Sequence, residues 1–144
     1  MIPTFIKHKL ATLTVQKTPS QKWTEQIMDY RKKCQTVLEL SKSIRYVGLV
    51  NEYGRTLTGI FRPGLATLLS NEPARNEFFL VSTMLTMRNK ASIALGNMDN
   101  VILKHSRVTV IIFQRKEGIY YISVNKSVTP DAVNKIISKI KKII

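Results

Sequence analysis

The sequence predicts an α/β fold of the α+β kind, a five-stranded antiparallel sheet with helices on both faces. Three segments place apolar residues at three- and four-residue steps, which is typical of helices. Five shorter runs rich in β-branched and aromatic residues are bounded by turn residues, which is typical of strands joined by hairpins. The order is helix, strand, strand, helix, three strands, helix. We therefore expect the long central helix on one face and the N- and C-terminal helices on the other.

The most informative stretch is residues 44–64, IRYVGLVNEYGRTLTGIFRPG. It predicts two strands and a tight turn, because Gly54 can adopt the positive φ that a short hairpin requires. Pro63 ends the second strand, since proline has no N–H to donate. Gly48 and Gly59 lie inside the strands, where glycine indicates a bulge or a close approach of another backbone.

The terminal helices carry clear start signals. Thr18 is the expected N-cap of a helix to about residue 41, with Pro19 in the first turn and Gln21 completing a capping box. Thr129 and Pro130 start the last helix in the same way. The expected buried stripes are Trp23, Ile27, Tyr30, Cys34, Val37 and Leu38 in the first helix and Val133, Ile136, Ile137, Ile140 and Ile144 in the last.

The central helix is expected over residues 71–95, with Ser70 as its cap and Gly96 as its stop. At about 100° per residue, one apolar stripe contains Ala74, Phe78, Val81 and Leu85, and a second contains Leu80, Met84, Met87 and Ala91. A single wide core face would account for both stripes. Because one sheet rarely needs two, we interpret the second stripe as a homodimer interface.

Three strands follow, at residues 101–103, 108–114 and 119–125. The run from Val108 to Phe113 is apolar almost throughout, which predicts a central strand covered on both faces. In the last strand Tyr120, Ile122 and Val124 alternate with Tyr121 and Ser123.

The formal net charge of +14 in 144 residues indicates attraction to an anionic partner, such as nucleic acid, a membrane surface or an acidic protein. Two basic sets are expected to meet on the face of the terminal helices. They comprise Arg31, Lys32, Lys33, Lys42 and Arg45, and Arg115, Lys116, Lys135, Lys139 and Lys142. No helix-turn-helix signature or stacking platform accompanies them. We expect nonspecific nucleic-acid binding at most.

No catalytic or cofactor-binding motif is present. The sequence lacks GxxxxGK[ST], GxGxxG and GxSxG, and two histidines with one cysteine give no zinc-ligand spacing. We therefore predict no enzyme activity, no cofactor, no metal site and no catalytic residue. The absence of a signal-peptide pattern, of a disulfide pair and of an apolar run of ~20 residues makes a cytoplasmic location the expectation.

Residues 1–17 are expected to form an N-terminal arm, either flexible or an additional strand, before a single domain at 18–144.

The segment order, together with the hairpin VGLVNEYGR at residues 47–55, resembles the roadblock/dynein-light-chain family of profilin-like folds. RYVGLVNEYGRTLTGIFRPGL, followed by NEPARNEFFLVSTMLTMRNK, is similar to small archaeal proteins with a roadblock-like layout. The resemblance covers about residues 25–144. It implies a non-enzymatic module that dimerises through its central helix, here residues 71–95, and a neighbouring strand. Such modules act as platforms for small GTPases or larger assemblies, although a charge of +14 is unusual among them.

The expected function is a homodimeric protein-interaction or regulatory module. Two alternatives stay open, which are a nucleic-acid-associated regulator that uses the basic surface and a small-ligand sensor with a pocket between sheet and helix.

Overall fold

The five strands form one antiparallel sheet in the computed structural model, which describes residues 16–144. Most of the expected N-terminal arm therefore lies outside the described residues. The strand order across the sheet is β2-β1-β5-β4-β3. The strands are β1 (Ile44–Val50), β2 (Thr56–Phe61), β3 (Val101–Lys104), β4 (Val108–Arg115) and β5 (Gly118–Asn125).

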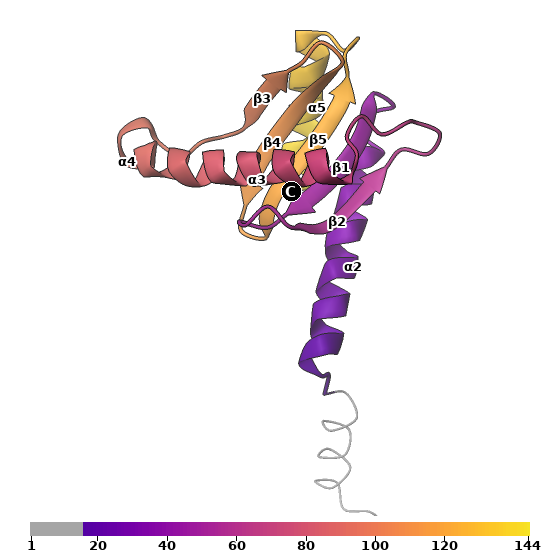
Figure 1. Ribbon diagram of the computed structural model, residues 1–144, viewed down its shortest axis with the longest axis vertical. Helices are drawn as coiled ribbons and strands as arrows, with labels where there is room; N and C mark the ends of the chain where they lie inside the picture. Colours follow the sequence, from indigo (N-terminus) through magenta and orange to yellow (C-terminus); the bar gives the residue numbers. More distant parts are fainter. Residues whose placement is uncertain (1–15) are drawn as a thin grey trace, which may run out of the picture.

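Helices cover both faces of this sheet (Figure 1). Helix α3 (Asn71–Arg88) lies across one face, and α2 (Pro19–Leu38) and α5 (Pro130–Lys141) lie on the other. A 3-10 turn, η1 (Asn89–Ala91), and the short α4 (Ser92–Leu95) follow α3. The predicted fold class and element order are confirmed.

The sheet separates two hydrophobic cores. On β5, Tyr120, Ile122 and Val124 belong to the core beneath α2 and α5, whereas Tyr121 belongs to the core beneath α3. Strand β4 is buried on both faces from Thr109 to Phe113, as its continuous apolar run predicted. The alternation along each strand thus assigns its side chains to one core or the other.

The N-caps of α2 and α5 agree with the sequence, whereas α3 differs in its cap and in where it ends. Thr18 and Gln21 form the predicted capping box, and Thr129 accepts a hydrogen bond from the Ala132 N–H. Ser70 occupies the cap position of α3, but its side chain makes no capping hydrogen bond. The central helix was predicted to reach Leu95, but α3 ends at Arg88 and the chain continues through η1 and α4 before Gly96 takes a φ of +83°.

The first half of α2 extends beyond the sheet (Figure 1). Of its predicted buried stripe only Cys34, Val37 and Leu38 are buried, and Trp23 is 53% exposed. The helical period was predicted correctly, but the sheet is too short to cover the whole stripe.

The β1–β2 turn packs directly against α3. Gly54 has a φ of +85°, and an added Cβ would lie 2.8 Å from Cα of Phe79 and 2.9 Å from its backbone nitrogen. Gly48 and Gly59 face each other across the two strands, and the ring of Tyr46 lies against both. A side chain therefore approaches these two glycines, and not another backbone, while the register shifts lie elsewhere in β1.

A polar network attaches α2 to the β4–β5 turn. Lys33 Nζ donates to Glu117 Oε2 at 3.0 Å, and the Tyr120 hydroxyl donates to the same oxygen at 2.8 Å. Burial alone would raise the pKa of Glu117, but the hydrogen bonds from its backbone N–H, Lys33 and Tyr120 outweigh it and lower that pKa. The carboxylate is thus held in its charged form.

We predict that Gly54→Ala destabilises the fold much more than Gly64→Ala. Gly64 also has a positive φ, at +83°, but an added Cβ there meets nothing within 4 Å. Both variants incur about 1–2 kcal/mol for the left-handed backbone, and only Gly54→Ala adds a collision worth about 1–3 kcal/mol. Urea unfolding measures both free energies, and equal losses would contradict the packing of the turn against α3.

We also predict that Glu117→Gln makes the free energy of unfolding depend less on pH below neutrality. A carboxylate with a lowered pKa stabilises the folded state above the unfolded pKa of about 4.3, and this contribution is lost as pH falls through the folded pKa. The free energy of unfolding is measured between about pH 7 and 3. Glu25→Gln, which removes an exposed partner of Lys17, is the control. Superimposable wild-type and Glu117→Gln profiles would refute the role of this network.

Candidate functional site

Helix α3 presents apolar side chains to solvent as well as to its core. Phe78, Val81 and Leu85 are buried against the sheet. On the outward side Phe79 is 58% exposed, Leu80 63% and Met87 65%. We call Phe79, Leu80 and Met87 the α3 outer surface. Of the predicted interface residues, Leu80 and Met87 lie on this surface, Met84 is half-buried and packs against the core beneath α3, and Ala91 lies in η1, half-buried.

A shallow hollow of about 220 Å³ adjoins the α3 outer surface at the β1–β2 turn. Its polar side chains include Ser82, whose hydroxyl donates to the Phe79 carbonyl, and Thr86, whose hydroxyl donates to the Ser82 carbonyl. These hydroxyls are satisfied within the helix, which lowers the cost of covering them. The lining residues are Glu52, Tyr53, Phe79, Ser82, Thr83, Thr86 and Met87.

Beyond the C-terminal end of α3, α4 projects past the sheet (Figure 1). Its Ile93 is 98% exposed, and Leu95 is also exposed. Sequence reasoning did not select these residues or Phe79. The adjacent pair Phe78–Phe79 carried a usable signal, because neighbours on a helix are about 100° apart and only one of the two can face the sheet.

A larger cavity, of about 310 Å³, lies on the α3 side of the sheet, between the sheet, the segment 65–69 and the first turns of α3. Its lining residues are Arg45, Tyr46, Thr56, Gly59, Phe61, Leu65, Ala66, Thr67, Leu68, Leu69, Ala74, Phe78, Val108, Val110, Tyr121 and Ser123.

Four aromatic rings lie in contact on this side of the sheet. The ring centroids are 4.5 Å apart for Tyr46 and Phe61, 6.5 Å for Tyr46 and Phe78, and 5.0 Å for Phe78 and Tyr121. Burial raises the pKa of Tyr46 to about 12, and burial together with the carboxylate of Glu77 raises the pKa of Tyr121. Both phenols therefore stay protonated at neutral pH.

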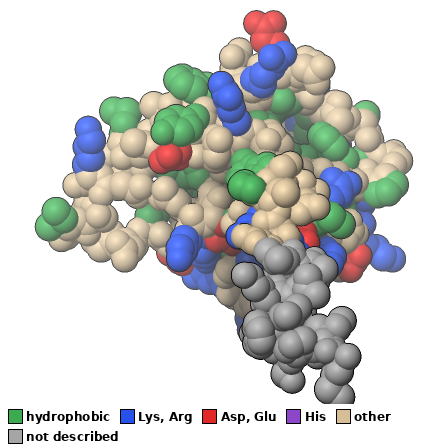
Figure 2. All heavy atoms as spheres, turned by 90° about the horizontal axis from the view of Figure 1, so that it is seen from below, with side chains coloured by type: hydrophobic (Ala, Val, Ile, Leu, Met, Phe, Trp, Pro, Cys, Tyr) green, Lys and Arg blue, Asp and Glu red, His purple; other side chains and the backbone are tan. Residues whose placement is uncertain are grey.

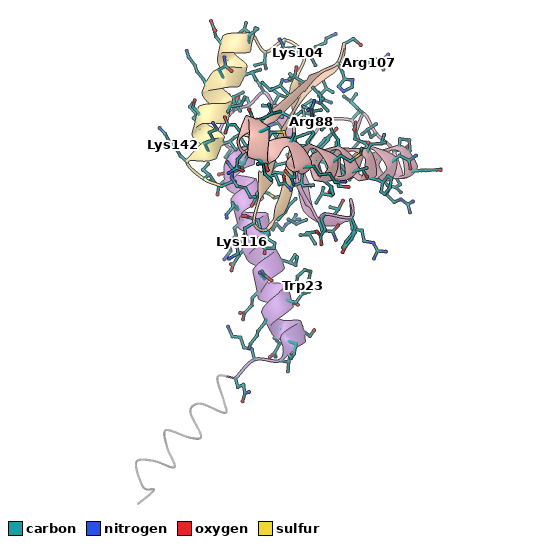
Figure 3. The ribbon with its side chains drawn as sticks, turned by 90° about the vertical axis from the view of Figure 1, so that its left-hand side faces the viewer. Trp23, Arg88, Lys104, Arg107, Lys116 and Lys142 are labelled. Carbon is teal, nitrogen blue, oxygen red and sulfur yellow. The ribbon has the colours of Figure 1, made fainter. Side chains whose placement is uncertain are left out.

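The basic side chains are spread over the molecule. Lys116 and Lys142 lie on the side of α2 and α5, whereas Lys104 and Arg107 lie around the β3–β4 connection (Figure 3). Figure 2 shows Lys and Arg interspersed with acidic and uncharged groups. Of the remaining predicted basic residues, Arg31, Lys32, Lys42, Lys135 and Lys139 are exposed, and Arg115 is half-buried with its guanidinium 5.3 Å from the Phe113 ring.

Two residues of the predicted basic sets have different surroundings. Lys33 pairs with Glu117. Arg45 lines the cavity on the α3 side, so it does not join the others on the face of α2 and α5.

The chemistry of the described residues is limited. Within residues 16–144 no three His, Cys, Asp or Glu side chains lie close enough to hold a metal ion. Cys34 is fully buried, and burial raises the pKa of its thiol to about 11, so it stays protonated and unreactive. No helix in the described part of the chain has both the length and the apolar character needed to cross a bilayer.

No family model and no curated protein matches the sequence, but solved structures match its fold. The gliding protein MglB from Thermus thermophilus has 11% sequence identity and a TM-score of 0.60, with 90% of each chain covered. Myxococcus xanthus MglB has 12% identity and a TM-score of 0.61 over 82% of this chain and 86% of its own.

A roadblock/LC7 domain from Streptomyces avermitilis has 10% identity and a TM-score of 0.56, with 76% of this chain and 89% of that domain covered. At such identities the likeness concerns the fold. The element order, the sheet and the helix placement are those of a roadblock-like protein, as the segment order and hairpin had indicated.

Proposed function

We propose that the protein is a non-enzymatic, homodimeric protein-interaction module of regulatory type. The observation that carries the proposal is the α3 outer surface, where Phe79, Leu80 and Met87 are each more than half exposed. Contiguous exposed apolar side chains mark interaction sites on soluble proteins. These side chains lie on α3, whose other side already covers the sheet. The partner that matches them best is therefore a second copy of α3.

A two-fold axis between residues 83 and 84 makes this surface self-complementary. With the two α3 helices antiparallel, Leu80 lies opposite Met87 of the partner subunit, and the reverse contact follows by symmetry. Apolar side chains of each subunit then contact the 220 Å³ hollow beside Thr83 and Thr86 in the other subunit. Each fully buried side chain of this kind contributes about 1.5–3 kcal/mol.

The edge strand β3 offers a second contact in the same assembly. It pairs with β4 on one side and has no strand on the other within the described sheet. In a two-fold dimer, β3 of each copy would continue the sheet into the other.

Known assembly of a similar fold supports this interpretation. A solved structure described as MglB with tetrameric arrangement has 12% identity and a TM-score of 0.57, with 90% of this chain and 92% of its own covered. That protein assembles from several copies, and we extend self-association to this chain as a proposal. The regulatory role follows from the resemblance to roadblock modules, which act as platforms for other proteins.

We predict that Leu80→Glu raises the dimer dissociation constant about 100-fold or more. Both copies of the residue lie in the proposed interface. Each substitution weakens the free energy of association by at least about 1.4 kcal/mol, which is tenfold in the dissociation constant, so the two together give about 100-fold. Sedimentation velocity over a concentration series measures the change. Because Leu80 is 63% exposed, the variant should melt like the wild-type monomer.

Met28→Glu is the matched control, since Met28 is 54% exposed but lies on α2. It should leave the dissociation constant unchanged. Equal effects of the two substitutions, or none from Leu80→Glu, would rule out the α3 outer surface as the interface.

A nucleic-acid-associated regulator is the second candidate, favoured by the net charge of +14. Because the cations are spread and partly paired, we predict weak binding without sequence preference. A gel-shift titration with two unrelated duplexes should give equal affinities at about 50 mM salt and loss of binding by about 200 mM. Sequence-selective binding that survives the higher salt would favour the second candidate over the proposed module.

A further inference from the structure

The 310 Å³ cavity has the build of a small-molecule site. Its volume lies at the lower end of the range of about 300–1,000 Å³ for ligand pockets. One wall is the sheet surface of Tyr46, Val110 and Tyr121, and the opposite wall is the segment 65–69. Leucines at 65, 68 and 69 contribute apolar surface that stays partly exposed. The lining is thus mainly apolar, with a few polar groups at defined points.

Arg45 supplies the positive charge of the cavity. Its Nη1 donates to Asn125 Oδ1 and its Nη2 to the Ala66 carbonyl, both at 3.1 Å. A guanidinium has five N–H donors, so most of its capacity remains after these two bonds. Among the described residues the ion pairs are Lys17–Glu25, Lys33–Glu117 and Lys141–Asp99, and Arg45 has no carboxylate partner.

Arg62 shows how a structural arginine is used in the same protein. Its Nε donates to the Ile44 carbonyl, and its Nη2 donates to the carbonyls of Leu38 and Ser41. It thereby joins the end of α2 to β1, and it does not line the cavity. Arg45 instead holds a side-chain amide at the end of β5 and one carbonyl of the cavity wall. Its position suits an anion that enters from the cavity.

We propose that this cavity binds an anionic amphiphile, a monocarboxylate with a medium-length apolar chain, whose carboxylate pairs with Arg45. Arg–carboxylate pairs form two parallel hydrogen bonds and are stronger than neutral ones, particularly where the arginine is half-buried. The chain of the ligand lies against Tyr46, Phe61 and the leucines of the segment 65–69. The bound ligand would contact the segment 65–69, which leads into α3, and the protein would thereby sense a small molecule.

Isothermal titration calorimetry of the full chain with decanoate tests the site, with 1-decanol and acetate as comparison ligands. We expect saturable binding of one decanoate per chain, binding of 1-decanol at least about tenfold weaker, since a hydrogen bond to a charged group contributes about 1.5–3 kcal/mol, and no binding of acetate. Absence of decanoate binding, or equal affinities for decanoate and decanol, would overturn the proposal.

Three variants locate the site. Arg45→Gln should weaken decanoate binding about tenfold or more and leave decanol binding unchanged. Arg75→Gln, which removes an exposed arginine outside the cavity, should bind both ligands like wild type.

Ala74→Leu should fill the cavity from α3 and abolish binding of both ligands, while thermal melting confirms that it folds. Decanoate affinity unchanged by Arg45→Gln or by Ala74→Leu would place binding elsewhere and refute the proposal. Leu80→Glu should retain decanoate binding, which separates this site from the proposed dimer interface.

Discussion

The structure depends on a mismatch between the area of the sheet and the single helix on one of its faces. Helix α3 crosses the strands (Figure 1), so a helix about 10–12 Å wide with its side chains has to cover strands such as β4 and β5, whose eight residues extend over roughly 25 Å. Two helices, α2 and α5, cover one face and bury a large core there. On the other face α3 stands alone over a smaller core. Part of that face is therefore left for something else to cover.

The two candidate sites both follow from this mismatch. The cavity lies where the sheet is covered by the segment 65–69 in place of a helix, and its floor is the sheet surface of Tyr46, Val110 and Tyr121. The α3 outer surface lies on the opposite side of the same helix from its core. A second copy of α3 would cover it, and extension of the sheet at β3 would widen the layer beneath. The ligand site and the interface are thus separate surfaces of one helix.

Periodicity was sufficient to predict the fold from the sequence. The alternation along 119–125 and the three- and four-residue steps in 133–140 assigned side chains to the correct core because each was long and regular. Boundaries were less predictable. The first helix was expected to bury a stripe from Trp23 onward, but only its last turns reach the sheet. A local sequence pattern does not show where the sheet that the helix packs against ends.

The candidate sites were only partly predictable. The second stripe identified Leu80 and Met87 as extra apolar surface, but Met84 packs against the core, and Phe79 was missed because it belongs to neither stripe, although spacing had assigned its neighbour Phe78 to the core. The cavity had no linear signal, since its residues come from four strands, a connecting segment and α3. Arg45 was grouped with other cations by proximity in sequence, although its side chain lies on the α3 side of the sheet. Such placements depend on tertiary contacts.

Helix α3 exposes more apolar surface than its own subunit covers, and we propose that two copies of the chain associate through it. Sedimentation equilibrium of the unmodified chain at micromolar concentration measures this directly. We expect a mass twice the 16.4 kDa of one chain. A mass of one chain throughout the accessible concentration range would contradict the account.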